Sequence, residues 1–300
     1  MENTGRAGAN RIAYEGATGG NMPTVQLKSS SNHPFQLGDE MRYQGFATNL
    51  GAVVLSNPVM HAQNTDELIV LVFPDWSSSD NDGLPCPGAP TITDINGNVY
   101  NTVQIGNQCW MRENLRTTHK ADGTTISFTE DSLSTSDAYY YDNSSSNMPL
   151  TERGYLYNWP AAIVACPTGW HLPSDTEWTI LTDYLSSHNE YICGENNNYI
   201  AKSLAATTGW KLSGDSCNIG SNQSINNASG FGAVPAGSAY YNDYYGRVMF
   251  QNVSKYTTFW TSTDSGTDDA WERNLSYLSP LVYRYTSYRY FGYSVRCLRD

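Results

Sequence analysis

The clearest periodic pattern in the chain is helical and begins after Ser174. Trp178, Leu181 and Leu185 recur at intervals of three and four residues, which places them on one face of a helix. The Ser174 hydroxyl can accept a hydrogen bond from a free amide of the first turn, and Glu177 completes a capping box. The sequence therefore predicts a capped amphipathic helix here, and we expect the rest of the chain to be organised around it.

Two further helices and a hairpin are predicted around this helix. Residues 158–166 predict a short helix with Pro160 in its first turn. Residues 199–208 predict another that ends at Gly209. Asn96 and Gly97 stand between two alternating runs, a pattern typical of a hairpin with a type I′ turn.

The pattern changes several times along the chain and indicates four parts. Short alternating or apolar runs at 24–29, 35–47, 52–55 and 67–73 predict about five strands. A cluster of Ser, Asp, Gly and Pro follows them and is typical of a linker. The predicted parts are an extended N-terminal arm (residues 1–25), a small all-β domain (26–75), a linker (76–90) and a large C-terminal domain (91–300).

Composition and charge exclude several classes of protein. The formal net charge is −12, and without a basic stripe the chain lacks the charge that neutralises phosphates, so we expect neither nucleic-acid binding nor attraction to anionic membranes. The longest apolar run, Leu68–Phe73, is the size of a strand and too short to span a membrane. The N-terminal residues have no basic segment followed by an apolar core, so we expect either no secretory signal or one that has been removed.

Four motifs are similar to those of a known family. In chain order they are DINGNVYNTVQIGNQCWMRENL (Asp94–Leu115), CPTGWHLPSDTEW (Cys166–Trp178), GFGAVPAG (Gly230–Gly237) and FGYSVRCLRD (Phe291–Asp300). Together they closely resemble the major paralogous domain family first described in Fibrobacter succinogenes and common in Bacteroidetes. The resemblance runs from about Cys86 to Asp300. It implies a C-type-lectin-like fold for the C-terminal domain. With the small all-β domain that the pattern indicates before it, the predicted fold class is α+β.

The six cysteines indicate disulfides, although six cysteines allow fifteen pairings. Our hypothesis names three pairs: Cys86 with Cys109, Cys166 with Cys297, and Cys193 with Cys217. The second pair would join the turn before the main helix to the last strand, as the resemblance to lectin-like folds implies. The alternative is six free thiols in a protein made in a reducing cytosol. No metal-ligand spacing is present, and we expect neither a metal nor a cofactor.

The last part of the chain is rich in tyrosine, with 11 of the 22 tyrosines in 54 residues. Tyrosine mixed with Ser, Asn and Asp is typical of adaptable binding surfaces, because the ring offers a large amphipathic contact area with few rotamers to freeze. The alternative is an ordinary β-surface. The candidate ligand-binding residues are Tyr240, Tyr241, Asn242, Asp243, Tyr244, Tyr245, Tyr256, Tyr277, Ser279, Tyr283, Tyr285, Ser287, Tyr288, Tyr290 and Tyr293.

Alternation in residues 281–293 predicts a strand, a turn and a returning strand. Tyr283 and Tyr285 should share one face of the first strand, with the turn at residues 286–287. Tyr288 and Tyr290 should share a face of the returning strand. The arginines between them should point the other way or stack on neighbouring rings; they are Arg284 and Arg289.

Enzyme chemistry finds little support in the residues. Glycoside hydrolysis needs two carboxylates on opposite sides of a sugar, whereas Asp264, Asp268 and Asp269 belong to a turn-like stretch. No order of Ser, His and Asp stands out, and neither calcium-binding lectin motif, EPN or WND, occurs. We therefore expect a binding protein and no enzyme.

The function expected from these observations is that of a non-catalytic receptor-binding protein, an adhesin. Its partner would be a bacterial cell-surface receptor, either a glycan or a protein. The scattered Tyr, Asn, Ser and Asp positions also resemble the variable proteins of diversity-generating retroelements. We expect a location in a virion, at a phage tail fibre or tail tip, where the N-terminal region would bind other virion or surface-assembly proteins and a homotrimer would suit the fibre. The alternatives are a secreted or lipid-anchored adhesin at the surface of a Bacteroidetes cell, and a structural pilus or tail subunit without a ligand.

Overall fold

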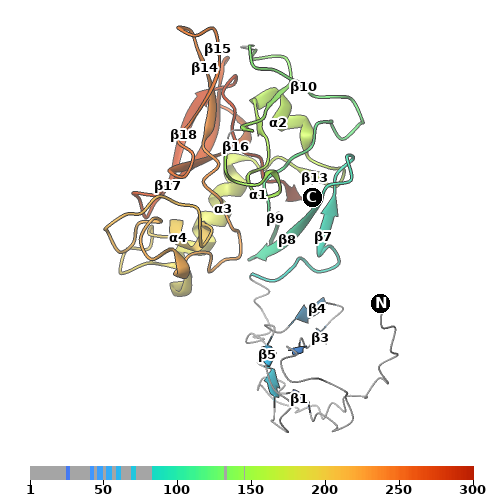
Figure 1. Cartoon of the computed structure of the whole chain (residues 1–300), viewed down its shortest axis with the longest axis vertical. Helices are drawn as coiled ribbons and strands as arrows, with labels where there is room; N and C mark the ends of the chain where they lie inside the picture. The colour runs from blue at the N-terminus through green and yellow to red at the C-terminus, as the bar shows by residue number, and fades with distance from the viewer. Residues whose placement is uncertain are drawn as a thin grey trace. The chain divides into compact units, whose positions relative to one another are not determined.

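The computed structural model describes residues 83–131, 134–144 and 146–300, together with the backbone of six short strands before residue 72. The chain divides into two units, Met1–Asp80 and Asn81–Asp300, each described by itself (Figure 1). The predicted arm before residue 25 and the predicted linker before residue 83 lie outside the described residues. The three predicted boundaries between the four parts therefore stay predictions.

Three antiparallel strand pairs form the described part of the first unit. They are β1 (Val25–Leu27) with β6 (Ile69–Leu71), β2 (Met41–Tyr43) with β5 (Val59–His61), and β3 (Phe46–Asn49) with β4 (Ala52–Leu55). Each run for which the pattern predicts a strand contains or overlaps one of them, and β5 is a strand that the pattern did not predict.

Four sheets make up most of the second unit. The largest has the order β13–β19–β9–β8–β7, so the last strand of the chain lies inside it. Its strands are β7 (Thr91–Thr93), β8 (Val99–Ile105), β9 (Gln108–Met111), β13 (Trp170–His171) and β19 (Leu298–Arg299). The other sheets contain β10 (Ser127–Phe128), β11 (Tyr139–Tyr141) and β12 (Leu156–Tyr157); the hairpin of β14 (Ser238–Asn242) and β15 (Arg247–Gln251); and the outer sheet of β16 (Tyr256–Asp264), β17 (Asp269–Ser276) and β18 (Val282–Tyr288).

The hairpin predicted around Asn96 and Gly97 is present between β7 and β8, but its turn is wider than predicted. Thr93 pairs with Val99, and between them only Gly97 has a positive φ. A type I′ turn needs a positive φ at both central residues, so this turn type is wrong. The Asp94 carboxylate holds the wider turn, because it accepts hydrogen bonds from the amides of the two asparagines in it.

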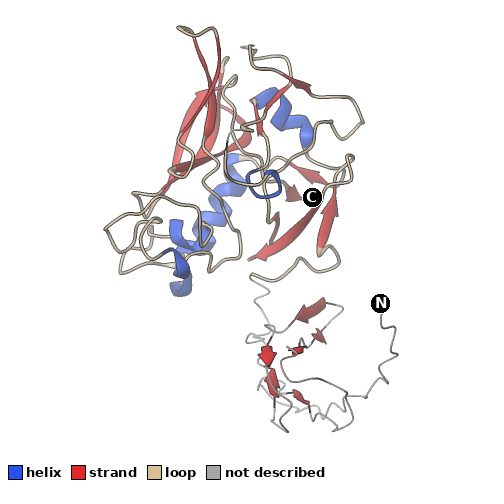
Figure 2. Cartoon of the chain, in the orientation of Figure 1, coloured by secondary structure: helices blue, strands red, loops and turns tan. Residues whose placement is uncertain are grey.

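The predicted capped helix is confirmed as α3 (Asp175–Ser186). Ser174 Oγ accepts a hydrogen bond from the Glu177 amide, and the Glu177 carboxylate accepts one from the Ser174 amide at 2.6 Å. Trp178, Leu181 and Leu185 are buried on one side of the helix. Figure 2 shows α3 between the outer sheet and the large sheet.

The other helices are short. The predicted helix with Pro160 in its first turn is confirmed as α2 (Trp159–Ala165), capped by Asn158. The helix predicted over 199–208 is only α4 (Ala201–Leu204), because the chain after it bridges to Ala233 through Ala205. The remaining short elements are α1 (Leu150–Arg153) and the 3₁₀ turns η1 (Asn189–Tyr191) and η2 (Gln223–Ile225).

The predicted fold class, α+β with a C-type-lectin-like domain, is wrong. The structure is mostly β, with 31% strand against 15% helix. The reason is physical: in the described residues only α2 and α3 are longer than a single turn, and the rest of the core is covered by strands and by loops that bridge to them.

An aromatic box fills the centre of the second unit. Trp110, Trp178, Phe231 and Phe259 lie with ring centroids 4.9 to 5.8 Å apart, and all four are fully buried. Beside this box lies Arg296, which is 1% exposed. It donates to the Asn114 side chain and to three backbone carbonyls, and its guanidinium lies 4.6 Å from the Phe231 ring centroid. Three widely separated parts of the chain, around residues 111–114, 231–232 and 296, therefore meet at this cation.

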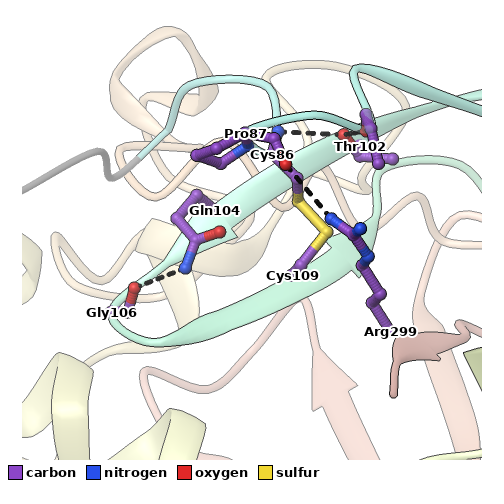
Figure 3. Close-up of a disulfide and its surroundings, with 8 residues drawn as sticks. Cys86, Pro87, Thr102, Gln104, Gly106, Cys109 and Arg299 are labelled. Carbon is purple, nitrogen blue, oxygen red and sulfur yellow. Dashed lines mark hydrogen bonds between the residues drawn. A yellow bond between two sulfur atoms is a disulfide. The ribbon is translucent and has the colours of Figure 1, made fainter. Parts of the chain in front are cut away.

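All six cysteines form disulfides: Cys86–Cys109, Cys166–Cys297 and Cys193–Cys217. These are the three pairs of the hypothesis. Figure 3 shows the first of them, which ties the segment before β7 to β9. Around it the Cys86 amide donates to Thr102 Oγ1, and Arg299 donates to the Pro87 carbonyl at 3.1 Å. The start of the second unit is thus fixed to the last strand of the chain.

Candidate functional site

The outer sheet carries two faces of different character. β17 is central, and β16 and β18 pair with it antiparallel. The inward face packs on α3: Arg273 donates to the Asp175 side chain at 2.7 Å and to Thr179 Oγ1 at 2.9 Å. The opposite face carries cross-strand rows in register, Trp260–Glu272–Tyr285 and Thr258–Asn274–Tyr283. This second face becomes more exposed from β16 towards β18.

The turn predicted at residues 286–287 is wrong, because β18 is one continuous strand. Ser287 pairs with Ala270 and Tyr288 with Asp269, so the ladder with β17 continues through both positions. Alternation along an uninterrupted strand places Tyr288 on the face opposite to Tyr285. The chain turns only after this point, where the Phe291 amide donates to the Tyr288 carbonyl.

Two stacks of tyrosine rings result. The first stack, Tyr283 on Tyr285, has ring centroids 5.5 Å apart and planes 15° apart. The second stack, Tyr288 on Tyr290, has centroids 5.3 Å apart and planes 9° apart. Tyr285 is 51% exposed and Tyr288 is 50% exposed, while the other ring of each stack is half-buried.

The hairpin β14–β15 adds a third aromatic pair at its tip. Tyr244 is 88% exposed and Tyr245 is 61% exposed, and their rings meet edge to face at 4.9 Å. The pKa of Tyr290 is raised, mainly by burial and then by the nearby Tyr288 and the carboxylate of Asp243. Because Asp243 lies at the hairpin tip, the tip is near the second stack. Figure 1 shows this hairpin and the outer sheet, in orange and red, at one end of the second unit.

The first stack has two further tyrosines beside it. The pKa of Tyr285 is raised by burial first, then by Tyr283, Glu272 and Tyr256, so the Tyr256 phenol belongs to the same group. Tyr277 meets Tyr256 edge to face at 6.4 Å. The first tyrosine cluster therefore consists of Tyr256, Tyr277, Tyr283 and Tyr285.

The remaining candidate residues, apart from Asp243, are half-buried or buried. Tyr240, Tyr241 and Asn242 are half-buried in β14, and Asp243 is exposed after it. Ser279 and Tyr293 are buried, at 4% and 8% exposure, so they cannot be part of a contact surface. They act on it from below: Ser279 donates to the Tyr283 hydroxyl, and Tyr293 donates to Ser287 Oγ, each at 3.0 Å.

The two arginines between the tyrosines stack on neighbouring rings, as predicted. The Arg284 guanidinium lies 3.4 Å from the Trp271 ring centroid and pairs with Asp175 at 2.9 Å. The Arg289 guanidinium lies 4.3 Å from the Trp159 ring centroid. Each arginine fixes one end of the segment that bears the two stacks, so the rings stand on a rigid support.

One polar residue of this face, Glu272, was not among the candidate residues that the sequence indicated. Glu272 is 4% exposed, and none of the described residues donates a hydrogen bond to its carboxylate, whose Oε2 is buried. Its neighbours across the strands are Trp260 and Tyr285. The alternation of the strand could have indicated this burial, because in DAWERNLS the acidic Glu272 is on the same face of a central strand as Ala270 and Asn274.

Other kinds of site are not found among the described residues. In the part of the chain that the structure describes, no three His, Cys, Asp or Glu side chains are grouped so that they could hold a metal ion. No helix described here has the length and the apolar composition of a membrane span. The turn carboxylate of Asp264 is largely exposed and lies 3.8 Å from Arg289.

Comparison with known proteins gives one match. The family described as the Fibrobacter succinogenes major domain matches residues 103–299. No curated protein and no solved structure matches the chain. The family match includes the aromatic box, the buried Arg296 and both tyrosine stacks. Because it covers about two thirds of the 300 residues, the chain belongs to the Fibrobacter succinogenes major domain family.

Proposed function

We propose that this protein is a non-catalytic receptor-binding protein, an adhesin, whose contact surface consists of the first tyrosine cluster, the second stack and the hairpin tip. The observation that supports it is the pair of exposed tyrosine stacks at the edge of a sheet whose central strand, β17, is mostly buried. Tyrosines dominate many recognition surfaces, because each ring buries a large area on binding and loses little rotamer entropy.

Rigidity supports the same proposal. The rings stack on each other, Ser279 fixes the Tyr283 hydroxyl, and Arg284 on Trp271 fixes the strand. A surface that is already ordered before binding loses less entropy when the partner arrives. An ordinary β-surface would not need this support for side chains that point to solvent.

The three disulfides are compatible with an extracellular or surface location, since such bonds persist in oxidising environments. We propose display at a phage tail fibre or tail tip, with the first unit bound to other proteins of the assembly. Display on the surface of a Bacteroidetes cell is the second candidate. Immunogold labelling of virions and of cells from the same culture distinguishes them.

We also propose that the exposed positions are diversified by a retroelement. The separation of exposed Tyr, Asn and Asp from the buried framework supports this, because the exposed set can change while Trp260 and Cys297 stay fixed. Sequencing of residues 238–300 across a propagated population tests it. Variation confined to the exposed positions is expected, and a uniform sequence contradicts it.

The test of receptor binding uses two double variants, Tyr283→Ser with Tyr285→Ser and Tyr288→Ser with Tyr290→Ser. Labelled protein is measured on a panel of intact bacterial cells by flow cytometry. An anchor ring at a contact surface contributes about 2 kcal/mol or more, which is about thirtyfold in affinity. We expect at least one double variant to lose cell binding by that factor.

The control is Ile95→Ser, an exposed apolar side chain (55% exposed) in the turn of the β7–β8 hairpin. It should leave binding unchanged. Thermal melts accompany each variant, because loss of the fold would also abolish binding. Full binding by both folded double variants would contradict the proposal and favour a structural subunit without a ligand.

A further inference from the structure

The first tyrosine cluster stands over a polar floor. Glu272, Asn274 and Ser276 follow each other on one face of β17, with Tyr285 and Tyr283 in register on β18 and Tyr256 in register on β16. Asn274 donates to Thr258 Oγ1 at 2.8 Å. The floor carboxylate therefore lies between aromatic walls, at the inner end of this row.

Glu272 is unusual among the acidic residues that the structure describes. Glu272 is 4% exposed, and its carboxylate accepts no hydrogen bond from any described residue. A buried carboxylate without partners is costly, and protein structures seldom keep one without a use for it. Arg273, the next residue, does not supply the partner, because its guanidinium is on the opposite face and bonds to Asp175.

We propose that Glu272 and the first tyrosine cluster form a binding site for a primary ammonium group, the side chain of a lysine on a protein receptor. This proposal rests on the receptor-binding function above and names the ligand chemistry of that same surface. The lysine stem would lie along the Tyr283 and Tyr285 rings, and the ammonium would bond to the carboxylate below them.

Three features favour an ammonium over other groups. The faces of tyrosine rings attract cations, most strongly where water is excluded. A compact ammonium on a flexible apolar stem can reach a carboxylate that is almost closed to solvent, whereas a planar guanidinium needs a wider opening. A negatively charged ligand would approach a chain with a net charge of −12, which opposes its binding.

The charge balance gives the site a pH dependence. Burial raises the pKa of Glu272 to about 8, with Arg273 acting in the opposite direction. The groups that face Glu272 are the phenols of Tyr285 and Tyr293. Burial is the main cause that raises the pKa of both phenols above the ordinary value of 10.0, so both stay neutral below pH 9. Binding of a charged lysine to the protonated acid therefore forms the ion pair and releases one proton from Glu272 to solvent.

The direction in which the affinity changes with pH follows from this release of a proton. A lysine ammonium stays charged up to a pKa of about 10.4, so among the groups of the site only Glu272 changes its charge between pH 6 and pH 8. Affinity should rise as the pH rises towards the pKa of Glu272, by up to about tenfold per unit. A site that attracts the ligand only through surface charge would show no such change in this range.

The experiment uses acetyl-tetralysine amide as the probe, titrated into the full chain by isothermal calorimetry at 0.15 M salt. We expect binding at pH 8.5 that weakens at least tenfold at pH 6. Glu272→Gln should lose at least tenfold in affinity at pH 8.5 and lose the pH dependence. The matched control Asp268→Asn removes an exposed acid and should stay within twofold of the unchanged protein.

Several results would overturn the proposal. Equal loss in Glu272→Gln and Asp268→Asn would show general charge attraction. Binding of the probe without pH dependence in the unchanged protein would contradict the role of Glu272, whatever the variant does. Binding of chitotetraose, an amino sugar, in place of the peptide would assign the site to a glycan and refute the lysine ligand.

The two proposals fail in different ways. If Tyr283→Ser with Tyr285→Ser loses cell binding and Glu272→Gln keeps it, the surface is a receptor site that does not take an ammonium group. If the tyrosine double variants bind cells normally, the receptor-binding function fails, even where the peptide binds. A melt of Glu272→Gln verifies folding; a neutral side chain of the same size should fold, since it resembles the protonated acid.

Discussion

The replacement of Arg296 by lysine tests how the framework beneath the tyrosine surface is held together. Burial lowers the pKa of Arg296 to about 9, so the fold accommodates a cation at a substantial desolvation cost. The compensation comes from four hydrogen bonds, to Asn114 Oδ1 at 2.7 Å and to the carbonyls of Met111, Phe231 and Gly232 at 3.2, 2.6 and 3.0 Å. No carboxylate among the described residues accepts a bond from this guanidinium.

A lysine keeps the charge but carries its donors on a single nitrogen. It cannot reach acceptors that the Nε and the two Nη atoms of arginine contact separately. Loss of two of the four bonds, at about 1.5–3 kcal/mol for each bond to a charged group, costs about 3–6 kcal/mol. For a unit of this size that is a fall in melting temperature of about 6–24 °C.

The assay is a thermal melt followed by near-ultraviolet circular dichroism, which reports the packing of the tryptophans in the aromatic box. The control is Arg247→Lys, at an exposed position in β15, which should shift the melting temperature by less than about 2 °C. A similarly small shift for Arg296→Lys would refute the reasoning. It would mean that the four bonds contribute little beyond the buried stem.

Two further predictions concern pH and backbone geometry. Burial lowers the pKa of His171, but hydrogen bonds to Asp300 at 2.6 Å and to Glu177 at 2.9 Å raise it above 6.5 overall. The stability that these bonds contribute is therefore fully present below pH 6.5 and is lost as the pH rises through the raised pKa. Urea unfolding should thus show His171→Gln destabilised relative to the unchanged protein at pH 6 and much less at pH 9; equal differences would contradict the assignment. Gly237 has a φ of +75°, and a Cβ there would overlap the Gln251 carbonyl oxygen, whereas Gly88 at +71° has open space. Gly237→Ala should therefore lower the melting temperature more than Gly88→Ala, and an equal effect would show that only the backbone conformation matters.

Local signals in the sequence predicted those elements whose stability is itself local. The capping box of α3 and the helix with Pro160 depend on residues within one turn, and both are present. The disulfide pairs also match the hypothesis, in which only Cys166–Cys297 came from the resemblance and the other two pairs came from the loop and the hairpin that they close. The family itself could be identified because its four motifs are visible in the sequence in the expected order.

Elements decided by distant partners were predicted less well. The helix expected over 199–208 stops early because Ala205 bridges to Ala233, which no local pattern shows. Thr286 and Ser287 suggested a turn, but seven paired positions with β17 keep β18 extended through both of them. The fold class failed for a similar reason: most of the second unit is formed by strand pairs and bridges between segments far apart in the chain.

The candidate site was predicted in composition but not in arrangement. The tyrosines were found because their number is visible in the sequence. Tyr293 and Ser279 were included wrongly as contact residues, since burial depends on what covers them. Glu272 was missed for the opposite reason: an acidic residue in a central strand is read as an exposed position, and only the packed structure shows that it is enclosed.

The position of β18 would let a varied surface and a fixed fold coexist in one sheet. β18 lies at the edge of the outer sheet, in the order β16–β17–β18, so only one of its sides is needed for pairing. Arg284 makes the inward contacts on Trp271 and Asp175, while the rings of Tyr285 and Tyr288, on opposite faces of the strand, are each half exposed. Changes at Tyr285 or Tyr288 should therefore alter binding at a small cost in stability, while changes at Trp260 or Arg296 should destabilise the domain strongly. Stability and recognition thus depend on different residues of the same few strands, and a receptor-binding surface that changes between relatives would require this separation.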